Sequence, residues 1–161
     1  MMRMSKGFGV RWQQERMDDL LTSLRLEPRL SALVEAPLIR RPGGLLLLDP
    51  LVAHATGPEA FQDRTGYEAF VNKFHVDDFL DDSRTTDTAR RSILFGQGVK
   101  PAVRLSERLE SEGPYRVLLS LDAELPTMTV RFFERRQVEP WGAEDPDAFP
   151  LEEVLMIDTR A

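Results

Sequence analysis

RVLLSL (residues 116–121), the short link DAELP (residues 122–126) and TMTVRFFE (residues 127–134) together have the pattern of a β-hairpin. In the second segment Met128, Val130 and Phe132 alternate with Thr or Arg, the pattern of a strand with one buried and one solvent-facing side. The link is short enough for a β-hairpin. We therefore predict two antiparallel strands, over Arg116–Leu121 and Thr127–Glu134.

Two further apolar runs predict strands. Val154–Ile157 is apolar throughout and lies close to the end of the chain. Leu45–Leu48 is a four-leucine run between Pro42-Gly43-Gly44 and Asp49-Pro50, and a short apolar run bracketed by turn residues is typical of a buried strand. The sheet is thus expected to form largely from the C-terminal half of the chain.

Helical patterns occupy much of the remaining sequence. Between Trp12 and Leu26 the apolar residues fall on one helical face, at Met17, Leu20, Leu21 and Leu24. After Pro28, Arg29–Glu35 could continue the helical pattern as a short second turn before Pro37. Ile93–Phe95 is short, apolar and followed by glycine, which predicts a short strand and a turn before the next helix. Pro101 suits the first turn of that helix, over Ala102–Glu110.

A helix over Gly66–Phe79 has the clearest local signal. Thr65 and Glu68 have the spacing of a capping box, in which the hydroxyl and the carboxylate satisfy free backbone amides. Apolar residues follow at helical spacing, namely Tyr67, Phe70, Val71, Phe74 and Phe79. We expect this helix to be capped by Thr65.

Helices early and strands late indicate an α+β fold, with N-terminal helices and a mainly antiparallel sheet. The 161 residues fit a single domain, residues 1–161. An apolar share of 42% is that of a globular protein, which argues against global disorder. The chain contains no cysteine, so disulfides, thiolate zinc sites and cysteine nucleophiles are excluded.

Charge and hydropathy narrow the expected partners and location. The net charge of −6 argues against direct nucleic-acid binding, which normally needs a basic face, and suits a basic protein partner. The sequence has no run near the ~20 apolar residues that span a bilayer, and no signal-peptide pattern at its start. We therefore expect a cytoplasmic protein without membrane binding and without a cofactor.

Two acidic clusters are the candidate partner-binding surface. The first crowds the end of the predicted Gly66–Phe79 helix, where negative charge opposes the helix dipole. The second lies in Glu139–Glu153, which has six carboxylates, no Lys or Arg, and two aromatic residues that could anchor an interface. The candidate residues are Asp77, Asp78, Asp81, Asp82, Trp141, Glu144, Asp145 and Asp147. The alternative is a loop whose Trp141 and Phe149 pack back onto the domain.

A catalytic interpretation centres on His75. Glu68, Asn72, His75 and Asp78 recur on one side of the predicted helix, and a histidine near carboxylates can act as a general base or a metal ligand. The polar side of an amphipathic helix gives the same pattern, so we expect no catalytic and no metal-binding residue. The alternative is a small hydrolase or transferase with His75 as base in a cleft near Gly96–Lys100. His54 could join such a site only through tertiary geometry.

The small size, the acidity, the absence of a catalytic motif and the segments Tyr67–Phe79 and Arg131–Asp158 together resemble the small acidic immunity proteins that bacteria encode beside contact-dependent or polymorphic toxins. This resemblance implies a cytosolic inhibitor, not an enzyme. Such a protein neutralises a cognate toxin, often a basic nuclease, by covering its active or substrate-binding surface. Immunity proteins have many unrelated folds, so no site residue is carried over.

Overall fold

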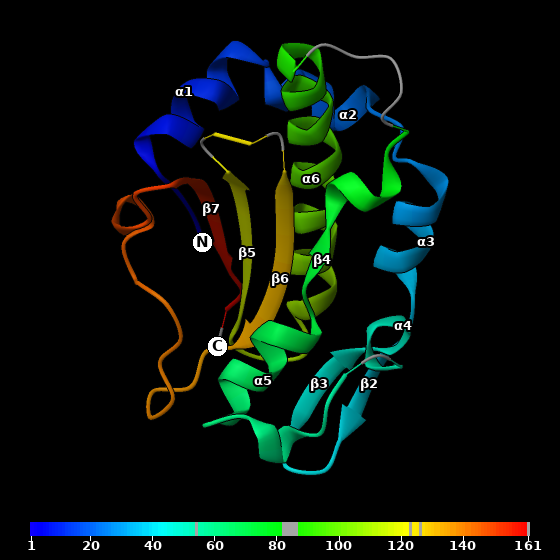
Figure 1. Ribbon diagram of the computed structural model, residues 1–161, viewed down its shortest axis with the longest axis vertical. Coiled ribbons are helices and arrows are strands. Elements are labelled where there is room, and N and C mark those ends of the chain that lie inside the picture. The colour runs from blue at the N-terminus through cyan, green and yellow to red at the C-terminus, as the bar shows by residue number, and fades with distance from the viewer. Residues whose placement is uncertain (54, 82–86, 123, 126, 161) are drawn as a thin grey trace.

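The computed structural model describes residues 1–53, 55–81, 87–122, 124–125 and 127–160 (Figure 1). Its main feature is an antiparallel five-stranded sheet in the order β1-β7-β5-β6-β4. The strands are β1 (Met2–Met4), β4 (Phe74–His75), β5 (Tyr115–Asp122), β6 (Met128–Glu134) and β7 (Glu152–Asp158). The predicted α+β class, with N-terminal helices and a mainly antiparallel sheet from the C-terminal half, is confirmed.

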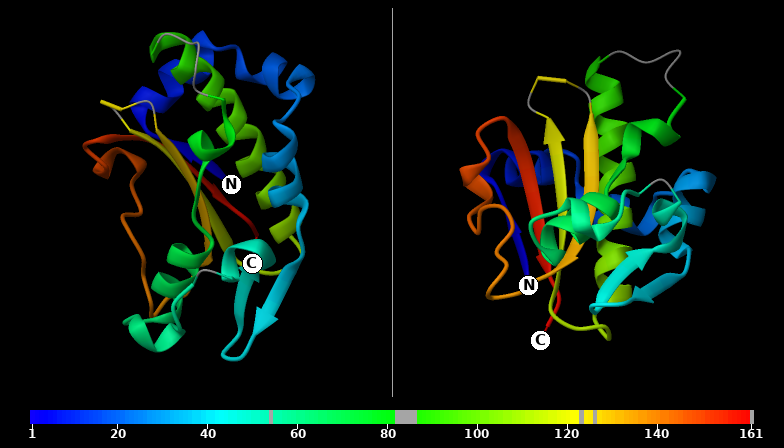
Figure 2. Two further views of the ribbon diagram at one scale, coloured as in Figure 1. Left: turned by 45° about the vertical axis from the view of Figure 1, so that its right-hand side comes forward. Right: turned by 60° about the horizontal axis from the view of Figure 1, so that its bottom comes forward.

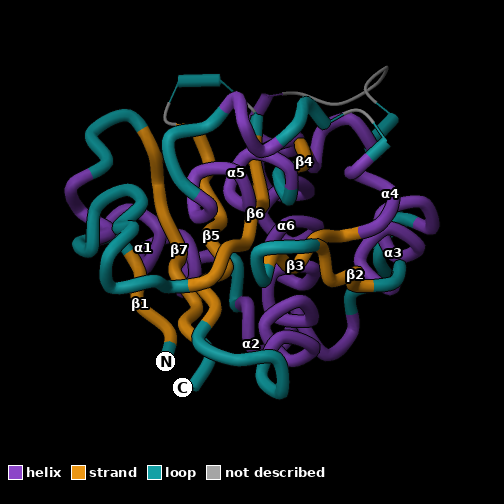
Figure 3. Tube along the Cα trace, turned by 90° about the horizontal axis from the view of Figure 1, so that it is seen from below, coloured by secondary structure: helices purple, strands orange, loops and turns teal. Residues whose placement is uncertain are grey.

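The four strands predicted at Leu45–Leu48, Arg116–Leu121, Thr127–Glu134 and Val154–Ile157 all form. β5 and β6 pair from Tyr115↔Glu134 to Leu121↔Met128, as the hairpin prediction requires. The C-terminal strand β7 pairs with β5 and receives β1 on its other side. The leucine run forms β3 (Leu45–Leu48), fully buried, which pairs with β2 (Leu38–Arg41) in a separate two-stranded sheet. Figure 3 shows this small sheet lying beside the large one without extending it.

One long helix, α6 (Asp87–Leu109), covers the inner face of the large sheet. The prediction of a strand at Ile93–Phe95 and of a new helix start at Pro101 is therefore wrong. The reason is a continuous apolar stripe that packs both halves of α6 on the same sheet, made of Leu94, Phe95, Val99, Ala102, Leu105 and Leu109. Gly98 permits a close approach, since a Cβ there would lie 2.0 Å from Met128 Sδ.

The N-terminal region forms three short helices instead of the single Trp12–Leu26 helix that was predicted. These are α1 (Lys6–Gln14), α2 (Met17–Ser23) and α3 (Pro28–Glu35). The break between α1 and α2 falls at Arg16, which has a positive φ of 50° that ends a right-handed helix. The turn lets Phe8 and Met17 both enter the core. The short helix predicted near Arg29–Glu35 is confirmed as α3.

The helix predicted over Gly66–Phe79 is largely wrong. α5 (Arg64–Val71) is capped by Asp63, whose Oδ1 accepts from Gly66 N at 2.6 Å, so Thr65 lies inside the helix. The helix ends because the Asn72 side chain bonds the backbones of β3 and β6. The chain then forms β4 and the 3-10 helix η2 (Val76–Phe79). The shorter elements are α4 (Asp49–Val52), η1 (Pro58–Ala60) and η3 (Pro146–Ala148).

The sheet has two unlike faces. The left view of Figure 2 shows α6, α1 and α3 on one side, and α5 with the segment of residues 135–151 on the other. We call the second side the outer face. It is covered only in part, because α5 is short and the segment of residues 135–151 contains no helix longer than η3. Within the described ranges, no helix is both long and apolar enough to span a membrane.

Candidate functional site

Strand alternation places a mixed row of residues on the outer face. Leu118 of β5 lies between Arg131 of β6 and Met156 of β7. The next row contains Ser120, whose Oγ lies 2.8 Å from Thr129 Oγ1. Leu118 and Met156 belong to a second, smaller core that is completed by Ala69 of α5, Phe133 and Val154. The outer face is therefore partly apolar and partly polar at its centre.

Trp141 and Phe149 pack onto this small core. The segment Glu139–Glu153, which we call the acidic loop, therefore packs back onto the domain, as the alternative interpretation expected. The Trp141 ring lies 5.0 Å from the Phe133 ring. Both aromatic residues remain half-buried, and the neighbouring Leu151 is 65% exposed. The segment of residues 135–151 thus lines the outer face without covering it.

Arg131 is the distinctive charged group of the outer face. Its Cζ lies 5.1 Å from the centroid of the Trp141 ring. Its Nε is buried and has no hydrogen-bond partner among the described residues. Burial lowers the pKa of Arg131, and the charge of Glu152 only partly offsets this. An arginine held in a desolvated position without a counter-ion is unusual in a folded domain.

Two hollows meet at Arg131 and Trp141, which line both. One, of about 300 Å³, is mostly apolar and is otherwise lined by Leu118, Phe149, Pro150, Leu151 and Glu152. The other, of about 330 Å³, runs toward α5 and is otherwise lined by Phe61, Gln62, Asp63, Gly66, Phe70 and Lys73. Phe70 is 50% exposed, and Lys73 Nζ lies 5.7 Å from its ring. Together the two hollows form what we call the outer-face surface, which is centred on Arg131.

The neighbouring Arg116 shows how an arginine on this face is normally satisfied. It is only 2% exposed and bonds Asp158 at 2.7 Å and Glu144 at 2.8 Å. Arg3 joins the same cluster through Asp158 at 2.8 Å. Although burial alone would raise it, the pKa of Asp158 is lowered by these hydrogen bonds and charges, and the Arg116 hydrogen bonds lower the pKa of Glu144. These groups connect β1, β5, β7 and the acidic loop.

The acidic loop therefore uses its carboxylates within the domain. Glu144 pairs with Arg116, Asp145 accepts from Asp147 N at 2.9 Å, and Asp147 accepts from Lys6 N at 2.8 Å. Glu139 bonds Arg64, and Glu153 bonds Arg11. Three carboxylates of this segment, those of Glu139, Glu144 and Glu153, are thus paired with arginines from distant parts of the chain.

The first acidic cluster lies at the edge of the sheet and not at a helix C-terminus. Asp77 Oδ1 accepts from Met128 N at 3.1 Å, so this carboxylate supports β6. Asp78 and Asp81 are exposed around η2. Asp82 lies outside the described residues. Of this cluster, Asp78 and Asp81 are the members left on the surface in the described part of the chain.

The residues of the catalytic alternative do not meet. His75 faces outward from β4, opposite Thr129. Glu68 is fully buried and bonds Leu46 N, Glu134 N and Arg136, while Gly96–Lys100 lies in α6 on the other face of the sheet. His54 is outside the described residues. Over the ranges that the structure covers, no group of three or more histidines or carboxylates could hold a metal ion.

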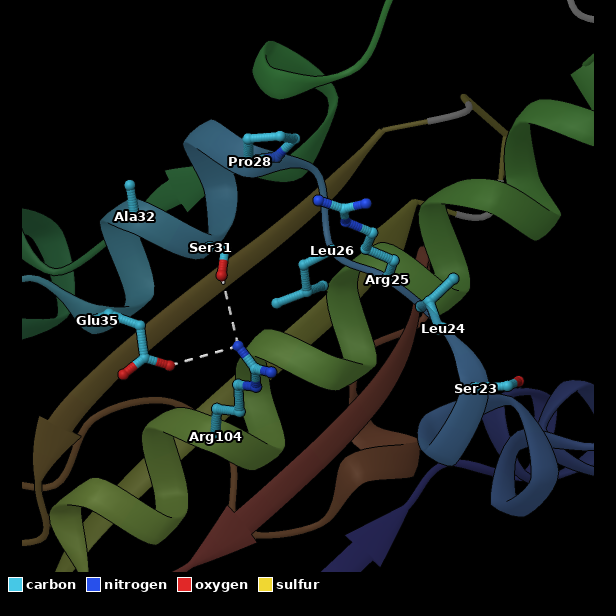
Figure 4. A pocket seen from close by; sticks show the side chains of 9 residues that line it. All are labelled: Ser23, Leu24, Arg25, Leu26, Pro28, Ser31, Ala32, Glu35 and Arg104. Atoms are coloured by element: carbon cyan, nitrogen blue, oxygen red, sulfur yellow. Dashed lines mark hydrogen bonds and ion pairs between the residues drawn. The ribbon is translucent and has the colours of Figure 1, made fainter.

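A larger hollow, of about 550 Å³, lies between α3, α6 and the segment that joins α2 to α3 (Figure 4). Its central cation, Arg104, is engaged by Glu35 at 3.3 Å and Ser31 at 3.5 Å. Figure 4 shows the Arg25 side chain near the rim, which is exposed to solvent. This hollow therefore presents no unpaired central charge, in contrast to the outer-face surface.

Comparison with known proteins gives a family but no activity. A family model matches residues 13–161, nearly the whole chain. The chain belongs to the Uncharacterized protein PM0498 family. No curated protein and no solved structure matches it. The matched region begins near the end of α1 and contains every helix and strand from α2 onward.

The sequence did not single out Arg131 as a site residue. From the sequence pattern, Arg131 was only one of the polar residues that alternate with apolar residues along a predicted strand. The available signal was a cation at mid-strand, where its polar neighbours on the same side are threonines, followed ten positions later by a tryptophan. Only the fold of residues 135–151 brings these two side chains into contact.

Proposed function

We propose that this member of the PM0498 family is a cytoplasmic protein-binding inhibitor, which covers a surface of a partner protein with its outer face. The observation that carries the proposal is the outer-face surface itself, where Trp141 and Arg131 line two adjoining hollows and the half-exposed Phe70 lines one of them. Tryptophan and arginine are enriched among the residues that dominate protein–protein binding energy. The resemblance to immunity proteins supports a toxin as the partner.

The structure changes which residues are expected to carry the binding energy. Glu144, Asp145 and Asp147 form hydrogen bonds within the domain, so they stabilise the fold even without a partner. Trp141 keeps its proposed role as an aromatic anchor. Asp78 and Asp81 are placed at the sheet edge, where exposed charge can steer a basic partner.

The test is a binding measurement with the product of a neighbouring toxin-like gene. We expect the purified proteins to form a complex in titration calorimetry. Trp141→Ala is expected to weaken this complex by about 2 kcal/mol or more, roughly thirtyfold in Kd, as for a central anchor residue. Phe70→Ala is expected to weaken it as well, and because Phe70 is half-exposed this variant should remain folded.

Ile93→Ala is the matched control. Ile93 is 46% exposed, close to the value for Phe70, but it lies on α6 at the other face of the sheet. Its replacement should leave the affinity unchanged. If Ile93→Ala weakens the complex as much as Phe70→Ala does, or if none of the three changes has an effect, the outer face is not the binding surface.

A further inference from the structure

Arg131 is an exception among the arginines on the outer face of the sheet. Arg3 and Arg116 are both held by Asp158 and Glu144. Arg131 lies one strand row away from Arg116 and forms no hydrogen bond or ion pair with any residue that the structure describes. The nearest influence on its charge is Glu152, which acts from a distance. The fold therefore holds a guanidinium with a buried Nε and no paired counter-ion among the described residues.

The surroundings of Arg131 define what could supply that counter-ion. The Arg131 Cζ lies over the Trp141 ring, 5.1 Å from its centroid, and the planar guanidinium still has N–H donors that can form hydrogen bonds to a ligand. The hollow beside it is lined mostly by the apolar side chains Leu118, Phe149 and Leu151. A ligand that both fills this hollow and pairs with Arg131 therefore needs an apolar group that carries a negative charge.

A carboxylate fits this site better than a phosphate. A guanidinium edge and a carboxylate match as two parallel hydrogen bonds. Glu152 and Asp63 line the two hollows, so a second negative charge on the ligand would meet repulsion. Lys73, in the hollow next to α5, is the other cation that lines the surface and forms no ion pair with a described residue.

We propose that Arg131 and Trp141 form a carboxylate-binding subsite, which receives an Asp or Glu side chain next to an apolar residue of the partner protein. This inference rests on the proposed function, since it names the chemistry of the partner's contact with the outer face. It adds a specificity element to the aromatic anchor. A partner surface without a carboxylate at this point would leave Arg131 buried and unpaired, which is unfavourable.

The subsite can be tested without the partner by using phenylacetate and the uncharged phenylacetamide as probes. The chain has two tryptophans, so a Trp12→Phe background makes Trp141 fluorescence the only tryptophan signal. In this background we expect phenylacetate to bind roughly tenfold more tightly than phenylacetamide, as for a charge-assisted hydrogen bond in a partly exposed site. Phenyl phosphate serves as the dianion control and should bind more weakly than phenylacetate.

Variants assign the preference to Arg131. Arg131→Met should abolish it, and thermal unfolding should be little changed because Arg131 has no bond to lose within the described chain. Arg131→Lys keeps the charge without the paired donors and should retain only part of the preference. Glu152→Gln removes a repulsive charge, so phenylacetate affinity should rise by about twofold or more.

Equal binding of phenylacetate and phenylacetamide, a preference that persists in Arg131→Met, or tighter binding of phenyl phosphate would each overturn the carboxylate subsite. The partner complex separates this inference from the proposed function. Loss of partner binding in Trp141→Ala without any loss in Arg131→Met would keep the outer face and reject the subsite. Suppose instead that the carboxylate preference is observed, but variants of Trp141, Phe70 and Arg131 bind the partner as tightly as the parent does. The subsite would then not be occupied by the protein partner.

Discussion

Glu68 and Asn72 illustrate how single polar side chains connect this domain. Both are fully buried, and both bond the backbone of β3 on one side and of β6 on the other. Arg136, itself only slightly exposed, supplies the countercharge to Glu68 at 2.8 Å. Buried polar groups are tolerated when all their partners are present. α5 therefore acts as a connector between the two sheets.

Removal of Glu68 should be among the most damaging single changes. Glu68→Ala removes the fully buried carboxylate that accepts from Leu46 N and Glu134 N and pairs with Arg136, although Arg136 keeps its ion pair with Glu134 at 2.6 Å. Breaking a buried pair of this kind costs up to about 3–5 kcal/mol. Glu68→Gln keeps an acceptor for Leu46 N and should cost less. The free energy of unfolding from urea titrations gives the measurement.

Glu112→Ala is the control for Glu68, since the Glu112–Arg40 ion pair at 2.6 Å lies at the surface. Its loss should cost at most about 1 kcal/mol. Comparable losses for Glu68→Ala and Glu112→Ala would show that the buried network contributes no more than a surface pair.

At the scale of elements, α6 approaches the large sheet closely at Gly98, which has no side chain of its own to separate the helix from the sheet. Gly98 lies where α6 crosses β5 and β6. A Cβ at this position would meet Met128 Sδ at 2.0 Å and Leu119 Cδ1 at 3.1 Å. Glycine is thus required here for packing, although it is a poor helix residue.

We expect Gly98→Ala to destabilise the protein by about 1–3 kcal/mol, because the crowding outweighs the gain in helix propensity. Gly9→Ala, in α1, should instead stabilise by up to about 1 kcal/mol, because a Cβ at that position would meet nothing within 4 Å. Chemical unfolding of the two variants decides between these effects. Stabilisation by both substitutions would mean that Met128 moves aside without loss.

At the scale of the whole molecule, one charge cluster joins the two ends of the chain. Asp158 in β7 bonds Arg3 near the N-terminus and Arg116 in β5, and Glu144 adds the acidic loop. The pKa values of both carboxyls are lowered in the folded protein by these arginines. The cluster therefore stabilises the fold only while its carboxylates are ionised.

The sign of the pH dependence follows from those shifts. A carboxyl with a lowered pKa in the folded state contributes its full stability above its ordinary value, here 4.5 for Glu144 and 3.8 for Asp158. We expect the unfolding free energy to fall as the pH drops below about 4.5 toward the lowered values. Asp158→Asn should be less stable at neutral pH and lose less on acidification. Urea titrations over a pH series measure both effects.

Asp19→Asn is the control for the acid dependence, because the Asp19–Arg16 pair is largely exposed. Its stability should follow the same curve with pH as the parent. A parallel curve for Asp158→Asn would contradict the assignment of acid lability to this cluster.

The net charge of −6 predicts how a basic partner would associate. Association should be faster at low ionic strength and slow down as salt screens the charges. Replacing Asp78 and Asp81 with Asn should reduce the association rate and change stability little, because both side chains are exposed, and Asp77 is left intact because it accepts from Met128 N. Stopped-flow rates at two salt concentrations test this, and equal rates for variant and parent would identify Asp78 and Asp81 as a solvated edge.

The sequence by itself determined those elements whose pattern is local. The alternation in residues 127–134, the apolar runs at Leu45–Leu48 and Val154–Ile157 and the short helix before Pro37 all formed as predicted, because each pattern matches the burial of its own element. The early helices followed by late strands were enough to give the α+β class.

The tertiary structure decided where those local signals were overridden. α5 ends at Val71 because Asn72 is needed by the backbones of two sheets, and α6 continues through Pro101 because both of its halves pack on one sheet face. The contact between Arg131 and Trp141, and the pairing of the acidic loop with distant arginines, also depend on residues far apart in the chain. Local periodicity reports which side of a segment is buried. It does not report whether a buried charge will be paired by a side chain from a distant part of the chain. The candidate binding surface depends on this pairing, because it is centred on Arg131, whose buried Nε has no hydrogen-bond partner among the described residues.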